Sequence, residues 1–411
     1  MGVLYPHCAG LDVHQRTVVA CVCHTDRRGH ATFTPRTFGT TTPELLDLQA
    51  EHVTHVAMEA TGSYWKPVYN LVEARFTTWV VNPAHMKNVP GRKTDVKHAT
   101  WITDLLRHGV LTPSFIPDQP QRELRELPRQ RTQWLAERAR DIQRVQKVLE
   151  GANSKLASVA TDVLGVSGRA MLDRWVAGET DPAILADLAV GRLRAKYDAL
   201  VPAWQGLMGD HQRFLRGPRL GHIDELTMRI ASLDAEIVRR VDPQVATIHL
   251  LGTIPGISRR TAEVIVAELG TDMTRFPAAD HAAAWAGWAP GQHESAGNRQ
   301  RAGTRRGNRS LRQALILAAW AASHTQTTFL GALYRRWVRR MPLKKAIVAL
   351  AHRLLVIVVH VLTDGQPDQD LGPTYHDARD RNQIVQRTVR RLEKLGLRVT
   401  VEPADPLPAT G

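Results

Sequence analysis

Short apolar runs separated by polar turns dominate the first eighty residues of the chain. Their β-branched and small apolar residues predict strands at 7–14, 17–25, 30–38, 55–59 and 77–81. Stretches at 43–52 and 63–74 have the composition of helices and lie between the later strands. Strands that alternate with helices indicate an α/β sheet in this part of the chain.

Apolar positions recur at helical spacing through most of the remaining chain. A helix is predicted to begin at Lys93, and residues 121–150 carry an apolar stripe with steps of three and four. Residues 152–220 are less periodic and predict several short helices. A seam close to a heptad repeat then runs from Ile223 to Val241. This seam can form a hairpin within the chain or an oligomer contact, and we favour a coiled-coil arm that mediates oligomerisation.

The last third of the chain predicts a compact helical part followed by a tail. Residues 250–269 predict a helix–hairpin–helix, in which the amides that begin the second helix face a phosphate. A short helix is expected at 276–288. An apolar helix is expected at 311–322, with Ser310 and Gln313 as a capping box. Residues 346–362 predict a buried helix rather than a membrane span. In the tail we expect an amphipathic helix through Val385 and Leu392 and a short strand at 397–401.

The charge of the chain points to a polyanionic partner. Its 411 residues include 54 lysines and arginines against 40 acids, a formal charge of +14. This excess favours nucleic acid over an acidic protein as the partner. Cys8, Cys21 and Cys23 fit neither a zinc site nor a disulfide scaffold, so we interpret them as small strand residues in a reducing cytosol. No signal peptide is indicated, and we expect a cytoplasmic, nucleoid-associated protein without a membrane span.

The stretch from Gly287 to Gln313, GWAPGQHESAGNRQRAGTRRGNRSLRQ, carries the most distinctive chemistry. Its glycines and polar residues predict a loop rather than a helix or strand. A serine at its entrance, Ser295, can form a covalent intermediate once it is activated. Arginine forks bind phosphate oxygens in pairs, and no acid interrupts the six that follow: Arg299, Arg301, Arg305, Arg306, Arg309 and Arg312. The alternative is that Ser295 is a turn residue in a solvated binding loop.

Two further basic segments are candidates for nucleic-acid contact. The first contains Arg92 and Lys93 and precedes a predicted helix. The second covers residues 332–345, which hold six basic residues and no acid, interleaved with Tyr334 and Trp337.

Three acids from distant positions, Asp12, Glu59 and Asp95, could converge on a divalent cation. Asp12 and Glu59 lie on predicted central strands, where an unpaired carboxylate is costly. Asp95 and His98 are three residues apart and share one face of a predicted helix, whereas Asp104 lies off that face. Mg²⁺ prefers a few carboxylates together with phosphate oxygens of the substrate. The alternative is that these are ordinary strand-end acids and an acid favoured by a helix dipole.

Taken together, these motifs resemble one family, the DEDD insertion-sequence transposases of the insertion sequence 110 family. The first half contains GLDVH, MEATGSYW and RKTDVKHATWITDLL, which resemble its RuvC-like domain. The second half contains PGISRRTA, WAGWAPGQHESAG and RRGNRSLRQALI, which resemble its serine domain. The matches run from about residue 7 to about residue 345 and are loose only in the middle helical section.

The resemblance implies a fold and a domain plan. We expect a RuvC-like, RNase H-like α/β domain at 1–120 and a helical coiled-coil region at 121–248. A mainly helical serine transposase domain with a helix–hairpin–helix is expected at 249–364, and a tail at 365–411. It also implies that Asp12, Glu59 and Asp95 bind Mg²⁺ or Mn²⁺.

The implied activity is DNA recombination that moves the protein's own mobile element. Ser295 would attack a DNA phosphate and form a covalent linkage, which frees a 3′-hydroxyl for strand exchange through a Holliday junction. The implied partners are the DNA of the element ends and target and a guide RNA that pairs with both. The implied assembly is a homo-oligomer, a dimer or tetramer, in which the acidic site of one subunit completes the serine site of another.

One position departs from the family pattern, which has two acids three residues apart on the helix. Here the second position is His98, which supplies no negative charge and is a poorer partner for a hard cation. We favour a His98 that replaces the acid as a metal ligand or proton carrier. The alternatives are compensation by Asp104, or a weakened copy that only binds nucleic acid. A structure-selective DNA nuclease that uses water remains the rival enzymatic interpretation.

Overall fold

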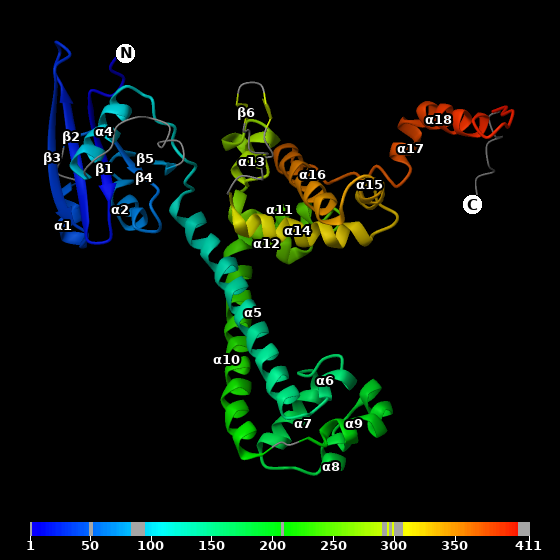
Figure 1. Cartoon of the computed structure of the whole chain (residues 1–411). Coiled ribbons are helices and arrows are strands. Elements are labelled where there is room, and N and C mark those ends of the chain that lie inside the picture. Colours follow the sequence, from blue (N-terminus) through cyan, green and yellow to red (C-terminus); the bar gives the residue numbers. More distant parts are fainter. Residues whose placement is uncertain are drawn as a thin grey trace. The chain divides into compact units, whose positions relative to one another are not determined.

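The computed structural model describes residues 2–48, 52–83, 95–206, 209–289, 294–295, 298–299 and 307–401 (Figure 1). The chain divides into two compact units, Met1–Pro120 and Gln121–Gly411. Of the residues singled out above, Arg92, Lys93, Arg301, Arg305 and Arg306 lie outside the described ranges.

The first unit is built on a five-stranded mixed sheet. Its strands are β1 (His7–Val13), β2 (Thr17–Thr25), β3 (Ala31–Gly39), β4 (His55–Glu59) and β5 (Thr77–Val81), in the order β3-β2-β1-β4-β5. β1, β2 and β3 pair antiparallel, whereas β4 runs parallel to both β1 and β5. All five predicted strands are therefore confirmed, with ends that differ by one residue at most.

Helices cover both faces of this sheet, which explains why β1 and β2 are apolar at nearly every position. α1 (Thr42–Leu48) and α2 (Trp65–Val72) pack on one face through residues such as Leu45, Val68 and Val72. α4 (Asp95–Arg107) packs on the other face through Ile102 and Leu106. The α/β character predicted from the sequence is thus confirmed for this unit.

Gly10 fixes the position of α4 on β1. A Cβ atom at Gly10 would lie 2.5 Å from the backbone nitrogen of Thr103, so only glycine allows this approach. The backbone N–H of Gly10 donates to Oγ1 of Thr103 at 2.9 Å, and that hydroxyl donates in turn to backbone carbonyls. This contact anchors the helix that carries Asp95 and His98.

Two long helices, α5 (Gln119–Gly151) and α10 (Asp210–Val241), form an antiparallel hairpin in the second unit (Figure 1). Ion pairs join the helices in reverse order along the chain: Arg240 with Glu123 at 3.0 Å, Arg131 with Asp234 at 2.5 Å, and Arg219 with Asp141 at 3.3 Å. The heptad-like seam is largely buried within one chain. The structure uses the seam for an intramolecular hairpin, whereas we favoured an oligomer contact, and oligomerisation through this arm stays a prediction.

Short helices close the far end of the hairpin around a core that includes Trp175 and Trp204. They are α6 (Leu156–Val159), α7 (Val166–Val176), α8 (Pro182–Asp187), the 3₁₀ turn η1 (Gly191–Lys196) and α9 (Tyr197–Trp204). Short helices were expected as far as residue 220, but α10 already begins at Asp210.

The next helices of the second unit form a bundle. They are α11 (Val245–Leu251), α12 (Arg259–Leu269), α13 (Ala279–Trp285), α14 (Arg309–His324), α15 (Phe329–Val338) and α16 (Leu343–Asp364), with short 3₁₀ turns η2 (Asp242–Gln244) and η3 (Met273–Arg275). In this bundle α11, α13, α14 and α15 pack on α16, and α12 packs on α11 and α14. α16 is long and apolar enough to cross a membrane, but half of its most apolar window is buried inside the protein. It packs on α13 and α14, as the prediction of a buried helix required.

The turn between α11 and α12 packs closely against α14. Gly256 has a positive φ of 90°, and a Cβ atom there would lie 2.4 Å from the carbonyl oxygen of Ala318. Ser258 caps α12, because its side chain accepts a hydrogen bond from the backbone N–H of Thr261. This cap therefore occupies the backbone N–H of Thr261, one of the amides of α12 that were predicted to face a phosphate.

Three sequence expectations for the second unit were wrong. Asn308 rather than Ser310 caps α14, because its side chain already accepts from the N–H of Leu311 at 3.0 Å. The serine loop contains two short strands, β6 (Glu294–Ser295) and β7 (Asn298–Arg299), although its composition predicted none. In the tail, α17 (Tyr375–Arg379) and α18 (Arg381–Glu393) form, but residues 397–401 make no strand, since no other strand pairs with them.

Candidate functional site

The acidic residues of the first unit lie on the face of the sheet that α4 covers. Side chains alternate along a strand, so Asp12 shares the face of Cys8 and Gly10, both of which contact α4. On β4, Glu59 shares the face of Ala57, which belongs to the core under α4. Asp95 and His98 lie in the first turn of α4. The sheet register therefore brings all four predicted residues to one place.

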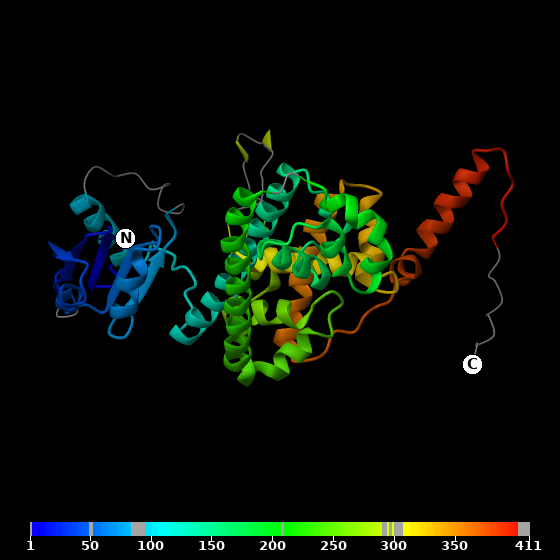
Figure 2. The same cartoon turned by 90° about the horizontal axis from the view of Figure 1, so that it is seen from below.

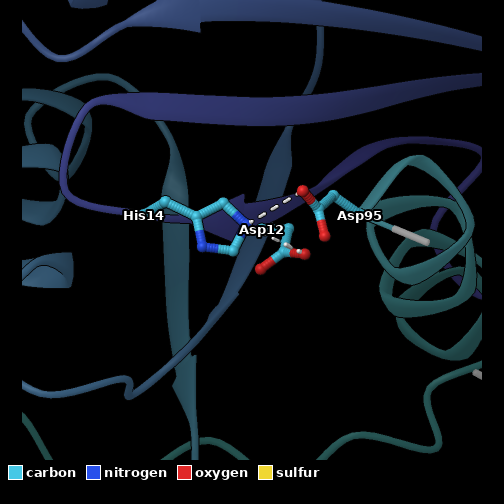
Figure 3. Close-up of side chains that lie close together, drawn as sticks. All are labelled: Asp12, His14 and Asp95. Atoms are coloured by element: carbon cyan, nitrogen blue, oxygen red, sulfur yellow. Dashed lines mark ion pairs between the residues drawn. The ribbon is translucent and has the colours of Figure 1, made fainter. Parts of the chain in front are cut away.

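Three of the ligand groups at this place are close enough to hold one cation. Nε2 of His14 lies 3.6 Å from Oδ2 of Asp12 and 3.5 Å from Oδ2 of Asp95 (Figure 3). One ligand atom from each of these residues lies within 4.8 Å of the others. A carboxylate pair with one imidazole suits a divalent cation that retains open positions for substrate oxygens. The donor set thus fits Mg²⁺ or Mn²⁺.

Asp12 is the buried member of this group, and its electrostatics are unfavourable without a counter-charge. Burial raises the pKa of the Asp12 carboxyl above its ordinary value. The neighbouring His98 and His14 oppose that rise, while Asp95 and Glu59 add to it. A bound cation would stabilise the ionised carboxylate of Asp12, so this group of residues favours the binding of a cation.

Glu59 and His98 pair with each other beside this group. Nε2 of His98 lies 2.9 Å from Oε2 of Glu59, and both side chains are about nine-tenths buried. The His98 ring stacks on Trp101 with centroids 5.6 Å apart, and its Nδ1 atom has no hydrogen-bond partner in the described part of the chain. His98 therefore contacts a carboxylate of the predicted set.

His14 is the residue that the sequence analysis missed. It follows Asp12 by two positions, the spacing that puts two side chains on the same face of a strand. That spacing was a usable signal for a second ligand group. Asp104, by contrast, pairs with Arg107 at 3.1 Å and His108 at 3.6 Å, away from the site, as its angular position on α4 predicted.

Ser295 lies in a tight hairpin in the second unit. β6 and β7 pair antiparallel, with Ser295 opposite Asn298 and Glu294 opposite Arg299. Figures 1 and 2 both show these short strands outside the helical bundle.

The loop that carries this hairpin is closed at its base by two glycines. A Cβ atom at Gly307 would lie 2.3 Å from the backbone nitrogen of Gly287. Gly307 precedes Asn308, and the first turns of α14 then present Arg309 and Arg312 beside a cavity of about 520 Å³. Of the six arginines of the serine loop, these two have described side chains.

A buried carboxylate connects the loop base to the long hairpin. Glu268 of α12 has a fully buried side chain, which accepts two hydrogen bonds of 2.7 Å from Arg129 of α5. Nδ2 of Asn308 donates to the same carboxylate at 2.6 Å. Arg125 donates to the last backbone carbonyls of α12, at Ala267 and Glu268, where a helix favours a cation. Sequence reasoning did not find this cluster, because its members are far apart in the chain.

Two family models match the chain. A model described as a transposase, of the DEDD IS110 type, matches residues 9–154. A second, for the transposase IS116/IS110/IS902 family, matches residues 248–335. Together they cover more than half of the chain, including both groups of candidate residues.

Curated relatives match shorter regions. The insertion element IS110 uncharacterized 43.6 kDa protein of Streptomyces coelicolor is 32% identical over 117 residues, 28% of this chain and 29% of that protein. The pilin gene-inverting protein of Moraxella bovis is 30% identical over 148 residues, 34% of this chain and 44% of that protein. The chain thus spans less than half the length of each relative. On the two family models, it belongs to the IS110 family of transposases.

Proposed function

We propose that this protein is a DNA recombinase that moves its own insertion sequence under the guidance of an RNA. The observation that carries the proposal is the convergence of Asp12, Asp95 and Glu59, from three separate segments, on one face of the sheet. Membership of a transposase family supports DNA as the substrate, and the name of the Moraxella relative, which inverts a pilin gene, supports recombination as the reaction class.

Ser295 is the proposed nucleophile. Its Oγ atom would form a bond to a DNA phosphorus as the bond to the 3′-oxygen breaks, and the serine proton would pass to a base or to solvent. The leaving 3′-oxygen would take up a proton from solvent or from that base, so the products are a phosphoserine linkage and a free 3′-hydroxyl that can reverse the reaction on another strand. The place of Ser295 in a strand pair opposite Asn298, within a stretch that holds six arginines, supports this role.

Asp12, His14 and Asp95 are the proposed ligands of Mg²⁺ or Mn²⁺, with Glu59 and His98 adjoining them. When bound, the cation would activate an oxygen nucleophile and stabilise the charge on a leaving oxygen. The residues themselves orient these groups: α4 holds Asp95 and His98 over the sheet through Thr103, and Glu59 holds the His98 ring. The mixed sheet with acids on β1 and β4 supports an RNase H-like domain at 1–120.

Arg309 and Arg312 are proposed to bind DNA phosphates beside Ser295, together with Arg299, Arg301, Arg305 and Arg306 of the same loop. Arg92 and Lys93 would do so next to the acidic site. The serine domain is proposed at 249–364 after a coiled-coil region at 121–248. We further propose that the protein acts as a homo-oligomer, a dimer or tetramer, in the bacterial cytoplasm.

A second candidate function is hydrolysis of branched DNA. The imidazole of His14, 3.5 Å from Asp95 and 3.6 Å from Asp12, favours this reading because it could accept a proton from an attacking water. Such a nuclease would need the acidic site and would not need Ser295.

A covalent-trapping assay separates the two functions. Protein, RNA from its own locus, Mg²⁺ and a labelled target DNA with a nick that prevents reversal are mixed and run on a denaturing gel. We expect a shifted protein–DNA band in the wild type and in Ser310→Ala, a matched control in the first turn of α14, and none in Ser295→Ala or Asp12→Asn. Cleaved DNA without that band, unchanged in Ser295→Ala, would establish the nuclease instead.

A further inference from the structure

The turn between α15 and α16 gathers four cations that have no partner among the residues that the structure describes. Arg339, Arg340, Lys344 and Lys345 are all exposed, and we call them the basic corner. Within the described part of the chain, none of the four forms an ion pair or a side-chain hydrogen bond. Tight turns of the backbone hold them together, since the N–H of Arg340 donates to Trp337 and that of Lys345 donates to Pro342.

Two of these cations lie where helix formation disfavours them. Lys344 and Lys345 are in the first turn of α16, which has no acid and no side-chain cap. The amino end of a helix carries partial positive charge, so acids stabilise it and lysines do not. The four charges also lie within seven residues of one another with no acid between them, so they repel one another. Folding alone therefore gives no reason for this cluster.

Several other basic residues of this unit are neutralised within the chain. Arg239 and Arg240 both bind Glu236, and Arg169 binds Asp173 and Asp224. Neighbouring Arg336 binds Asp380 at 2.6 Å. Unlike these paired residues, the four cations of the basic corner lie within seven residues that contain no acid, and this clustering favours an anion of another molecule.

We propose that the basic corner binds the phosphate backbone of duplex DNA, at a surface separate from the serine loop. This rests on the proposed function only in taking DNA as the substrate. Single strands bind through aromatic stacking, but the nearby Tyr334 and Trp337 are half-buried. A membrane would need a broad apolar face, but beside the exposed Leu343 the next apolar residues of α16, Ala346, Ile347 and Leu350, are buried in the protein. Four point charges without exposed rings fit the regularly spaced phosphates of a duplex.

Because this surface contacts phosphates alone, it would position DNA without reading its sequence. Its contribution to affinity would come from counterion release, and binding would weaken linearly with the logarithm of salt concentration. It would hold duplex flanking the reactive strand while the serine loop contacts the reacting phosphate.

Fluorescence anisotropy with a duplex of about 30 base pairs across a salt series tests this proposal. Lys344→Gln with Lys345→Gln should reduce the salt slope by about two, and the quadruple variant with Arg339→Gln and Arg340→Gln by about four. The double variant should keep or raise the melting temperature, which shows that lost binding is not lost folding. Arg239→Gln with Arg240→Gln, whose cations are already paired, should leave the slope unchanged.

Each other outcome overturns the proposal. An unchanged slope in the quadruple variant would show that the corner does not contact duplex DNA. A loss confined to an RNA hairpin, or to vesicles of phosphatidylserine, would assign the corner to RNA or to a membrane. Ser295→Ala is expected to bind duplex DNA with the wild-type salt slope while it forms no covalent complex. Failure of the serine chemistry is thereby distinguished from failure of duplex binding at the basic corner.

Discussion

The imidazole of His98 lies 2.9 Å from the carboxylate of Glu59, at the helix position where the family pattern has a fourth acid. The ring can donate a hydrogen bond to Glu59. Two acids at these positions would repel each other, whereas the imidazole and the carboxylate attract each other. The substitution therefore stabilises the site without a metal, and it also reduces the negative charge available to one.

His98→Asp should exchange stability for metal affinity. Without metal, two nearly buried carboxylates would face each other, and we expect the free energy of unfolding to fall by about 1 to 3 kcal/mol. Added Mg²⁺ should recover more stability than it does in the wild type, and the covalent DNA complex should form at least as fast. Urea unfolding with EDTA or Mg²⁺, together with the trapping assay, measures both.

His98→Asn serves as the control for that experiment, since it removes the ring without adding charge. It should lose the contact to Glu59 but gain no additional response to Mg²⁺. If His98→Asp binds Mg²⁺ more tightly and yet fails to recombine DNA, the imidazole itself is required, and the idea that it stands in for an acid is wrong.

Asp12→Asn should stabilise the metal-free protein. The pKa of Asp12 is raised by burial, so the fold favours its protonated form. That favourable contribution is complete below the carboxyl pKa of an unfolded chain, about 3.9, and is lost as the pH rises through the higher folded pKa. The advantage of asparagine should therefore be small at acidic pH and grow to about 1 to 2 kcal/mol at neutral pH.

Urea unfolding in EDTA at several pH values measures this difference. Asp12→Asn should also abolish the increase in melting temperature that Mg²⁺ gives the wild type. The matched control is Asp104→Asn, an exposed acid paired with Arg107, which should keep the Mg²⁺ effect. A Mg²⁺ response that survives in Asp12→Asn would remove Asp12 from the metal site.

Most of the acidic site could be predicted, because the alternation of side chains along a strand determines which of them lie on the same face. β1 and β4 were placed within one residue, and the alternation of side chains then puts Asp12 and Glu59 on one face. The same rule should have included His14, two residues after Asp12. The pairing of His98 with Glu59 could not be predicted, because it depends on how Gly10 and Thr103 seat α4 on the sheet.

The serine region was less predictable for a different reason. Local rules favoured Ser310 as the cap of α14, since serine is a good cap and Gln313 follows it at the right spacing. The structure selects Asn308, whose amide also reaches Glu268 of α12. A tertiary hydrogen bond thus decided between two local solutions, and sequence spacing carries no information about that bond.

Glu268→Gln should weaken the junction between α5, α12 and the start of α14. The substitution keeps the shape of the side chain but removes the charge that pairs with Arg129 and Arg125. Breaking a buried ion pair leaves a partner uncompensated, and we expect a loss of about 3 kcal/mol, reduced to the extent that solvent reaches Arg129. Chemical denaturation gives this value.

The control for Glu268 is Glu236→Gln, which breaks solvent-screened ion pairs with Arg239 and Arg240 and should cost much less stability than Glu268→Gln. Asn308→Ser adds a second test, because serine keeps the cap of α14 but cannot donate to Glu268 as the amide does. If Glu268→Gln costs no more than Glu236→Gln, the buried cluster does not fix the loop base.

Gly307→Ala should open the base of the serine loop and slow covalent-complex formation. A Cβ atom there would lie 2.3 to 2.4 Å from the backbone of Gly287 and Ala286, and backbone atoms cannot rotate away as a flexible side chain can. The two ends of the loop must then separate, which moves the hairpin of Ser295 relative to Arg309.

Gly221→Ala is the matched control, because its Cβ would meet nothing within 4 Å in helix α10. That control should stabilise the protein by about 0.5 to 1 kcal/mol and leave the reaction unchanged. Hydrogen exchange at residues 286–288 and 307–309, compared with single-turnover trapping of DNA, measures both effects. Faster exchange with an unchanged rate of trapping would show that closing the loop base stabilises the fold and does not position Ser295.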